Sequence, residues 1–221
     1  MFNPRSAIYL DFEGEGEKSS GEIPEPRLSG VFRPHPTGKS GVYTPIYHNV
    51  SWQPLINGVR PTGHYDSLEG LISSLIAEAK ITDSKIVYWS DHERRMVNEL
   101  LPELTQEFEQ HSFNLLPQAR KLKRKFKKSL NEDEPKGLNQ YLLAFSLPNS
   151  TVPNIHPGAA ESCRRLDKYC AANKRWRRWT EQQKAIARVL VEYNAKDCIG
   201  LYRLARKVCW HTVKRAPHPT S

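Results

Sequence analysis

Apolar and polar residues alternate in the first strand-like segment of the chain, residues 8–13. This pattern sets Ile8, Leu10 and Phe12 against Tyr9, Asp11 and Glu13. A period of two is typical of a β-strand with one face turned to a core. The same period places the carboxylates of Asp11 and Glu13 on one side of the strand. We expect the rest of the chain to be organised around this segment.

Two further segments, Leu28–Arg33 and Val42–His48, also have strand-like patterns. The Gly-, Glu- and Pro-rich residues 14–27 precede them and predict a loop, since Gly14 and Gly16 interrupt the first strand. Prolines between and after the two segments are turn or edge signals. The N-terminal part of the chain therefore predicts about three antiparallel strands.

A helical pattern follows, with Asp66 as a candidate N-cap and Glu69 three residues later. Its apolar residues recur at helical spacing: Leu68, Leu71, Ile72, Leu75, Ile76 and Ala79. Residues 84–88 then predict a short buried strand, and a second helix carries Met96 and Val97. Strands followed by a helix–strand–helix unit indicate a layered α/β domain.

The C-terminal half is mostly helical in pattern. Residues 139–147 predict a short helix or an irregular connection, and a helix is expected from about Ala159 with residues 174–179 in its middle. The last helix is expected from about Thr180 to Val208, and residues 214–221 form a Pro-containing tail that predicts disorder. Residues 1–213 are expected to form a single domain.

Composition narrows the class of protein. The chain has 221 residues, of which 38% are hydrophobic and 26% charged, enough for one well-cored domain. No segment has the ~20 uninterrupted apolar residues that a membrane span needs. The N-terminus does not resemble a signal peptide. We therefore expect a cytoplasmic protein without a membrane partner. The four cysteines form no Cys-x-x-Cys pair, which favours reduced structural thiols over zinc ligation.

The charge balance favours polyanionic partners. Lys and Arg number 33 against 24 acidic residues, which gives a net charge of +9. One basic segment lies at residues 120–128 and includes Arg120, Lys121, Lys123, Arg124 and Lys125. It predicts either a phosphate-binding surface or a solvated helix face neutralised by the acidic residues 131–134.

The second basic segment combines arginine with tryptophan: Lys174, Arg175, Trp176, Arg177, Arg178 and Trp179. Arginine side chains could contact phosphates while the indole rings stack on unpaired bases. The alternative is that the tryptophans anchor the segment on the core. The pattern favours neither interpretation over the other.

The carboxylates are the candidate chemistry. Asp11 and Glu13 repel each other and lose solvation if their strand is central, so a cation between them is expected. Oxygen ligands of this kind suit Mg²⁺ or Mn²⁺; the alternative is a solvated edge strand. Asp197 falls within the apolar stripe of the last helix, four residues after Tyr193 and four before Leu201. Asp197 is therefore expected to lie beside Asp11 and Glu13. The alternative is that it lies at the edge of the stripe and contacts water or Arg203.

A further acidic ligand is expected where residues 84–88 meet the following helix. Glu93 precedes Met96 and Val97 by three and four residues, which places it on the inward side of that helix. Asp91 is the alternative ligand, although its position also predicts the N-cap of the helix. We favour Glu93.

These acids together resemble the three motifs of the DnaQ-like 3′–5′ exonucleases, the DEDD group of the ribonuclease H-like superfamily. The motifs are Asp11-Phe12-Glu13, the Asp91/Glu93 junction, and the run from Tyr193 to Asp197. Tyr-x-x-x-Asp is similar to the tyrosine variety of the group. Tyr-Asn-x-x-Asp-Cys followed by Leu201 and Leu204 is similar to predicted ribonuclease H-like nucleases of the YprB type, some associated with RecB-family nucleases.

The resemblance implies a mixed five-stranded sheet with flanking helices. It also implies two Mg²⁺ or Mn²⁺ ions held by Asp11, Glu13, Glu93 (or Asp91) and Asp197, with Tyr193 orienting the attacking water. The expected activity is phosphodiester hydrolysis, as a 3′–5′ exonuclease acting on DNA or RNA with a single-stranded 3′ end. The group usually has Asp in its second motif, so Glu93 is a departure, and its longer side chain predicts a different metal geometry.

Three other functions compete with this one. They are a catalytically weak or inactive nucleic-acid-binding relative, a structure-specific endonuclease on the same fold, and an adaptor without chemistry. A PD-(D/E)xK nuclease is disfavoured because its Glu78-Ala79-Lys80 element would lie on an amphipathic helix rather than a strand.

Overall fold

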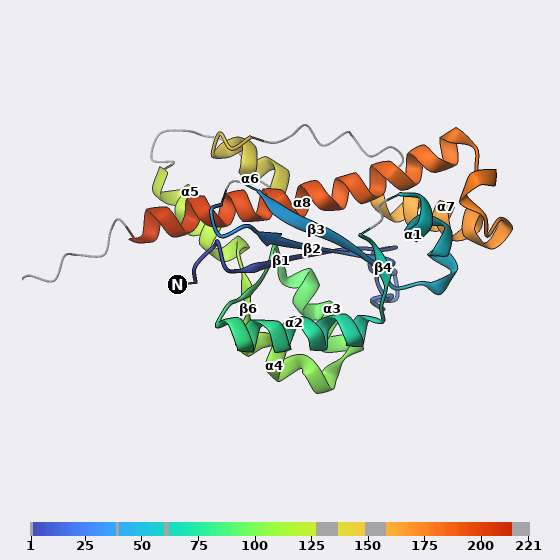
Figure 1. Cartoon of the computed structure of the whole chain (residues 1–221). Helices are drawn as coiled ribbons and strands as arrows, with labels where there is room; N and C mark the ends of the chain where they lie inside the picture. Colours follow the sequence, from blue (N-terminus) through green and yellow to red (C-terminus); the bar gives the residue numbers. More distant parts are fainter. Residues whose placement is uncertain (1, 39, 60–61, 127–136, 149–157, 214–221) are drawn as a thin grey trace, which may run out of the picture.

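A computed structural model describes residues 2–38, 40–59, 62–126, 137–148 and 158–213. Over these residues the chain forms an α/β structure with a six-stranded mixed sheet (Figure 1). The strands are β1 (Ile8–Glu13), β2 (Leu28–Pro34), β3 (Gly41–Tyr47), β4 (His64–Tyr65), β5 (Ile86–Tyr88) and β6 (Ser112–Asn114). Their order in the sheet is β4-β3-β2-β1-β5-β6.

The predicted three-stranded antiparallel unit is confirmed, because β1 pairs with β2 and β2 with β3 in antiparallel register. β5 and β6 add to the other side of β1 in parallel, and β4 pairs in parallel with β3. The expected five strands are therefore six. The edge strands β4 and β6 have only two and three residues, too few to produce an alternating pattern. β1 lies inside the sheet.

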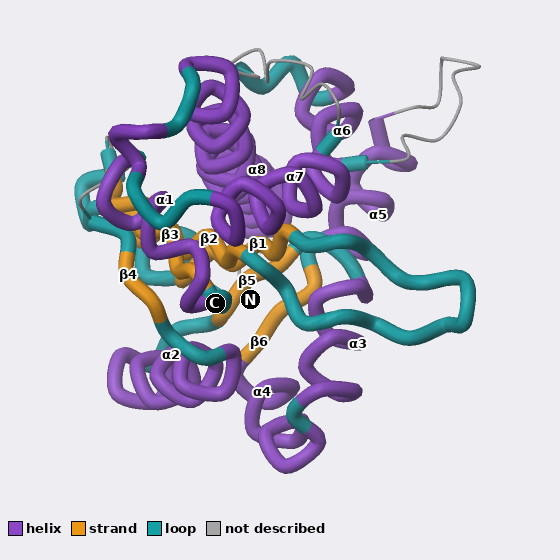
Figure 2. Tube along the Cα trace, turned by 90° about the vertical axis from the view of Figure 1, so that its right-hand side faces the viewer, coloured by secondary structure: helices purple, strands orange, loops and turns teal. Residues whose placement is uncertain are grey.

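Helices cover both faces of the sheet. One layer holds α2 (Leu68–Thr82), α3 (Asp91–Leu100) and α4 (Thr105–His111), and the other holds α8 (Glu181–Val213). Figure 2 shows the sheet between these layers. The remaining helices are α1 (Gln53–Gly58), α5 (Leu116–Phe126), α6 (Leu138–Ala144) and α7 (Ala159–Ala172), with 3₁₀ turns at Val50–Trp52, Pro102–Leu104 and Trp176–Arg178.

The sequence periodicity explains the two cores. Ile8, Leu10 and Phe12 pack with α2 and α3 on one face of the sheet. Tyr9 belongs to the other core, which α8 covers together with α5, α6 and α7. The alternation predicted for residues 8–13 therefore divides β1 between the two cores and turns its polar positions toward α8.

Several predicted boundaries were wrong. The N-cap of α2 is Ser67, whose side chain accepts a hydrogen bond from the Gly70 N–H, rather than Asp66. The helix from Ala159 ends at Ala172 because Asn173 is extended, so residues 174–179 are not in its middle. α8 continues to Val213 rather than ending near Val208.

Other expectations concern residues 127–136 and 214–221. The acidic residues 131–134, the last two residues of the basic segment 120–128 and the C-terminal tail all lie outside the described residues.

Candidate metal centre

Two carboxylates of β1 face α8 at the centre of the sheet. Asp11 pairs with Gly30 and Glu13 with Leu28 across the β1–β2 ladder. Glu13 is buried, whereas Asp11 retains some solvent contact. Since both residues lie on the face of β1 that is turned toward α8, they lie under that helix.

Asp197 is brought to the same place by α8, which packs on β1 and β2. Ligand oxygens of Asp11, Glu13 and Asp197 all lie within 4.8 Å of one another. Asp197 is only 9% exposed, and its Oδ1 accepts no hydrogen bond from any described residue. The position of Asp197 in the helical stripe thus places it at the carboxylates of β1, not at water or Arg203.

Burial and mutual repulsion strongly disfavour the charged forms of these acids. Burial raises the pKa of Glu13 to about 8, and the charge of Asp197 adds to the effect. The pKa of Asp11 is raised well above its ordinary value, first by burial and then by Glu13, Asp197 and Glu93. Burial raises the pKa of Asp197 to about 6, although a hydrogen bond from Tyr193 opposes the shift. Three hard oxygen donors with uncompensated charge and one unpartnered oxygen fit a divalent cation.

Glu93 lies near this group but not in it. It is buried, and its charge raises the pKa values of Asp11 and Glu13. Its Oε2 accepts hydrogen bonds from the Ser90 N–H (3.1 Å) and the Ser90 hydroxyl (3.1 Å) as part of a capping box. Burial raises the pKa of Glu93 itself to about 7. Glu93 would have to release or share its bonds to Ser90 to serve as a ligand.

Asp91 does not approach the centre. Its side chain is 67% exposed, with Oδ1 3.3 Å from Arg94 Nε and 3.2 Å from Asn114 Nδ2. The expectation that Asp91 caps α3 was wrong, because Ser90 is the N-cap. Between the two alternatives for the further ligand, only Glu93 is close to the other acids.

Tyr193 is one helical turn before Asp197 and is half-buried. Its hydroxyl is hydrogen-bonded to Asp197, and burial together with the charges of Asp197, Glu13 and Asp11 raises its pKa. The phenol therefore stays protonated and acts as a hydrogen-bond donor at the edge of the carboxylate group.

A cavity of about 220 Å³ opens beside the centre. It is lined by Phe12 and Glu13 of β1, by His92 and Met96 of α3, and by the loop that follows β1. The cavity gives Glu13 a route to solvent on the side of α3.

Asn194 is a site residue that sequence reasoning did not select. It is fully buried, and its Nδ2 donates to Asp11 Oδ2 at 2.7 Å. Its Oδ1 accepts from the Tyr43 hydroxyl at 2.7 Å, which fixes the orientation of the amide. Asn194 therefore holds one oxygen of Asp11 in place. Its signal in the sequence was a polar residue on the buried face of α8, three positions before Asp197.

Asn194→Ala is expected to weaken Mn²⁺ binding by about 10–100-fold, the usual cost of losing a group that orients a ligand. Tyr43→Phe should have a smaller effect in the same direction, since it removes only the hydroxyl that orients the amide. Calorimetric titration with Mn²⁺ measures both effects. Equal affinity in wild type and Asn194→Ala would show that Asp11 does not depend on this contact.

Gly30 allows Asn194 to reach Asp11. A Cβ at residue 30 would lie 2.0 Å from Asn194 Oδ1 and 2.7 Å from Cys198 Sγ, so α8 could not keep its position over β2. Gly30→Ala is expected to lower the free energy of unfolding by about 1–3 kcal/mol. It should also weaken Mn²⁺ binding. Gly137→Ala is the matched control, because nothing lies within 4 Å of a Cβ there; urea denaturation of both variants tests the difference.

The first basic segment lies on α5. Arg120, Lys121, Arg124 and Lys125 are exposed, but Lys123 is only 6% exposed. Because α5 packs against α8, Lys123 faces the protein interior. Four of the five candidate side chains could therefore contact a phosphate, and Lys123 could not without moving.

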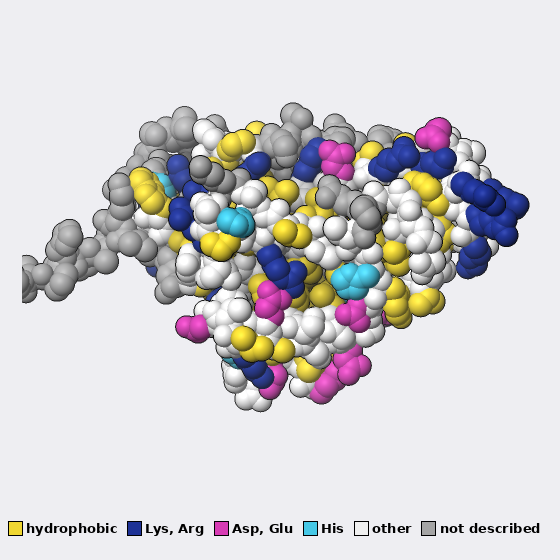
Figure 3. Space-filling view, in the orientation of Figure 1, with side chains coloured by type: hydrophobic (Ala, Val, Ile, Leu, Met, Phe, Trp, Pro, Cys, Tyr) yellow, Lys and Arg dark blue, Asp and Glu magenta, His cyan; other side chains and the backbone are white. Residues whose placement is uncertain are grey.

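The second basic segment is the turn between α7 and α8. Lys174, Arg175, Arg177 and Arg178 are exposed, and Figure 3 shows a dense group of basic side chains at this end of the molecule. Both tryptophans serve as anchors: Trp179 is buried, and Trp176 packs against Gly58 of α1. The turn could present cations, while its tryptophans hold it to the fold.

Comparisons with protein-family models, with curated proteins and with solved structures found no match to this chain. Among the described residues, no helix has the length and apolar character that a membrane crossing requires. The four cysteines are unpaired and buried, and burial raises the pKa of each thiol. Their burial agrees with the expected structural role.

Proposed function

We propose that this protein is a metal-dependent nuclease with a ribonuclease H-like fold, which hydrolyses phosphodiester bonds from a 3′ end. The observation that carries the proposal is the group of three carboxylates from β1 and α8 within 4.8 Å. A mixed sheet with carboxylates on an inner strand, covered by a helix that supplies another acid, supports the resemblance described above.

Asp11, Glu13 and Asp197 would hold the ion, and Glu93 would complete a second site by turning away from Ser90. When bound, Mg²⁺ or Mn²⁺ lowers the pKa of a water nucleophile and stabilises the charge that develops on the leaving oxygen. Tyr193 would donate a hydrogen bond that orients the attacking water, and Asn194 would keep Asp11 in place. The exposed cations of α5 and of the turn at residues 174–178 would bind backbone phosphates.

The test is cleavage of 5′-labelled single-stranded DNA and RNA by the full chain with Mn²⁺ or Mg²⁺. A ladder that shortens from the 3′ end, present in wild type and absent in Asp197→Asn, is the expected result. The substrate that is cut identifies the sugar. Internal cuts that depend on Asp197 would assign an endonuclease instead. Tight nucleic-acid binding without cleavage of either substrate would overturn the proposal in favour of a binding protein.

A further inference from the structure

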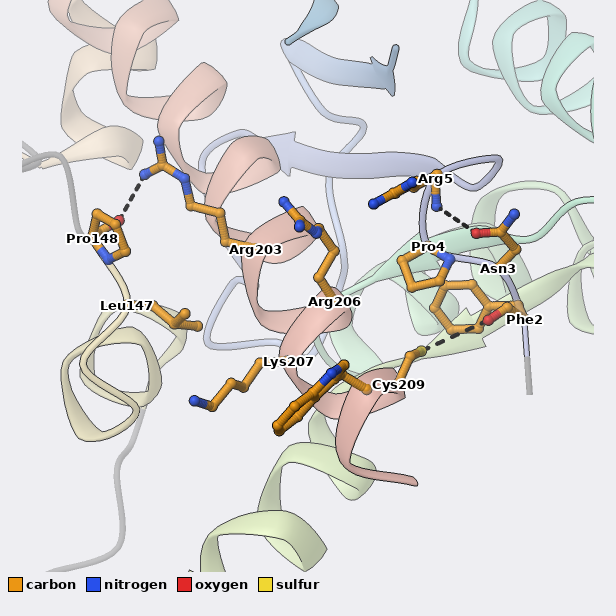
Figure 4. A pocket seen from close by; sticks show the side chains of 11 residues that line it. Phe2, Asn3, Pro4, Arg5, Leu147, Pro148, Arg203, Arg206, Lys207 and Cys209 are labelled. Carbon is orange, nitrogen blue, oxygen red and sulfur yellow. Dashed lines mark hydrogen bonds between the residues drawn. The ribbon is translucent and has the colours of Figure 1, made fainter. Parts of the chain in front are cut away.

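A second cavity lies at the other end of β1 from the carboxylates. It has a volume of about 850 Å³, within the usual ~300–1,000 Å³ of ligand sites. Its walls come from the segment Phe2–Arg5, from Leu147 and Pro148 after α6, and from the last turns of α8 (Figure 4). Arg206 is nine residues after Asp197, roughly 13 Å along the helix axis.

Four cations line this cavity: Arg5, Arg203, Arg206 and Lys207. None of them forms an ion pair within the described parts of the chain. Arg203 donates to the Pro148 carbonyl at 2.7 Å, and the Arg206 guanidinium lies over the Tyr202 ring. In Figure 4, Arg206 stands between Arg203 on one side and Arg5 on the other.

Several basic residues elsewhere in the fold are neutralised. Arg27 pairs with Asp167, Arg33 with Glu78, and Arg95 with Glu17. The four cations of the cavity differ from these three in having no acidic partner among the described residues, so their positive charge stays concentrated. It creates a site that attracts an anion.

The cavity also has apolar and aromatic walls. The Trp210 side chain is 51% exposed, and Phe2 and Leu147 are half-buried. An exposed indole beside arginine is suited to stacking on a planar base. An acidic peptide would use the cations but has no need of that surface.

We propose that this cavity binds a nucleotide unit, with its phosphate on Arg203, Arg206 and Lys207 and its base against Trp210. The unit belongs to a single-stranded nucleic acid or to a free nucleotide, which share this chemistry. The site does not include the carboxylates, so nucleotide binding there can be tested separately from the proposed nuclease activity.

The test is fluorescence anisotropy of a labelled thymidine oligonucleotide, of a length within the ~4–16 nucleotides typical of single-strand sites. It is done with the full chain in EDTA, which removes metal chemistry. Arg206→Gln with Lys207→Gln is expected to lower the affinity about tenfold. It should also reduce the slope of log K against log salt by about 1.4, the value for two lost phosphate contacts on a single strand.

The matched control is Lys18→Gln with Lys80→Gln, which makes the same change in net charge at two exposed positions that pair with Glu22 and Glu107. It should leave affinity and slope unchanged. Equal losses in both double variants would overturn the proposal, because attraction would then follow net charge alone.

The aromatic wall is tested by Trp210→Leu, expected to lower the affinity about fivefold or more, and by Trp210→Phe, expected to retain most of it. Competition with free thymidine monophosphate separates the two sources: displacement identifies a free nucleotide as sufficient, and no displacement identifies the strand. If polyglutamate displaces the oligonucleotide from wild type and Trp210→Leu binds normally, the cavity is an acidic-peptide site and the proposal is wrong.

Discussion

Asp197→Asn is expected to abolish metal-dependent cleavage and, without metal, to make the protein more stable. The activity should fall by about 10³-fold or more, because a metal ligand supplies several kcal/mol of transition-state stabilisation. The stability should rise because the ionised Asp197 is buried, which gives it a pKa of about 6 in place of its ordinary 3.8. That shift corresponds to a cost on the order of 2–3 kcal/mol above pH 7, which the amide does not carry.

Urea denaturation in EDTA at pH 8 measures the stability difference, and the labelled-strand assay measures the activity. Asp167→Asn is the matched control. Its carboxylate accepts from Arg27 Nε (3.0 Å) and from Trp52 Nε1 (2.7 Å), so the same chemical change should destabilise the protein by about 1–3 kcal/mol. If Asp197→Asn also destabilises the metal-free protein, the Asp197 carboxylate has a stabilising partner within the protein, and its assignment as a metal ligand is wrong.

The metal-free protein is expected to lose stability as the pH rises from about 4 to 8. Folding raises the pKa of Asp197 to about 6, of Glu93 to about 7 and of Glu13 to about 8. A group with a raised pKa binds more protons when folded, so its contribution is complete below the ordinary pKa and disappears as the pH passes the folded value. Burial lowers the pKa of His48, which acts in the opposite sense below about pH 6.5.

Comparison of wild type with Glu13→Gln over the same pH range isolates the carboxylates, because His48 is common to both. The wild-type curve should fall more steeply between pH 6 and 8. Mn²⁺ should restore the lost stability at pH 8, by about 2.7 kcal/mol at a free concentration 100 times its dissociation constant. Parallel curves for the two proteins, or no response to Mn²⁺, would contradict a cation site at Glu13.

The elements that have a periodic pattern of apolar residues could be predicted from the sequence. The alternation in residues 8–13 located β1 and the shared side of Asp11 and Glu13, and the stripe of α8 indicated that Asp197 faces the sheet. β4 and β6 were missed because two or three residues carry no period. Their pairing depends on neighbours distant in sequence.

The surroundings of the carboxylates were less predictable. The contact of Asn194 with Asp11 spans 183 positions, and its contact with Tyr43 spans 151. Lys123 was grouped with its exposed neighbours because a run of charge does not show which residue a helix turns inward. The different positions of Asp91 and Glu93 have a local cause. Ser90 is the N-cap of α3, so Asp91 is exposed to solvent and Glu93 is turned inward.

The absence of a side chain at Gly30 has a consequence for the evolution of related sequences. Residue 30 has no side chain, and the space above it admits Asn194 and thereby allows α8 to lie close to β2. A lineage that acquires a side chain at this position should keep the fold and lose the proposed metal-dependent activity. Glycine at the equivalent of residue 30 together with asparagine at the equivalent of residue 194 should therefore mark the relatives that keep the proposed activity, before any protein is purified.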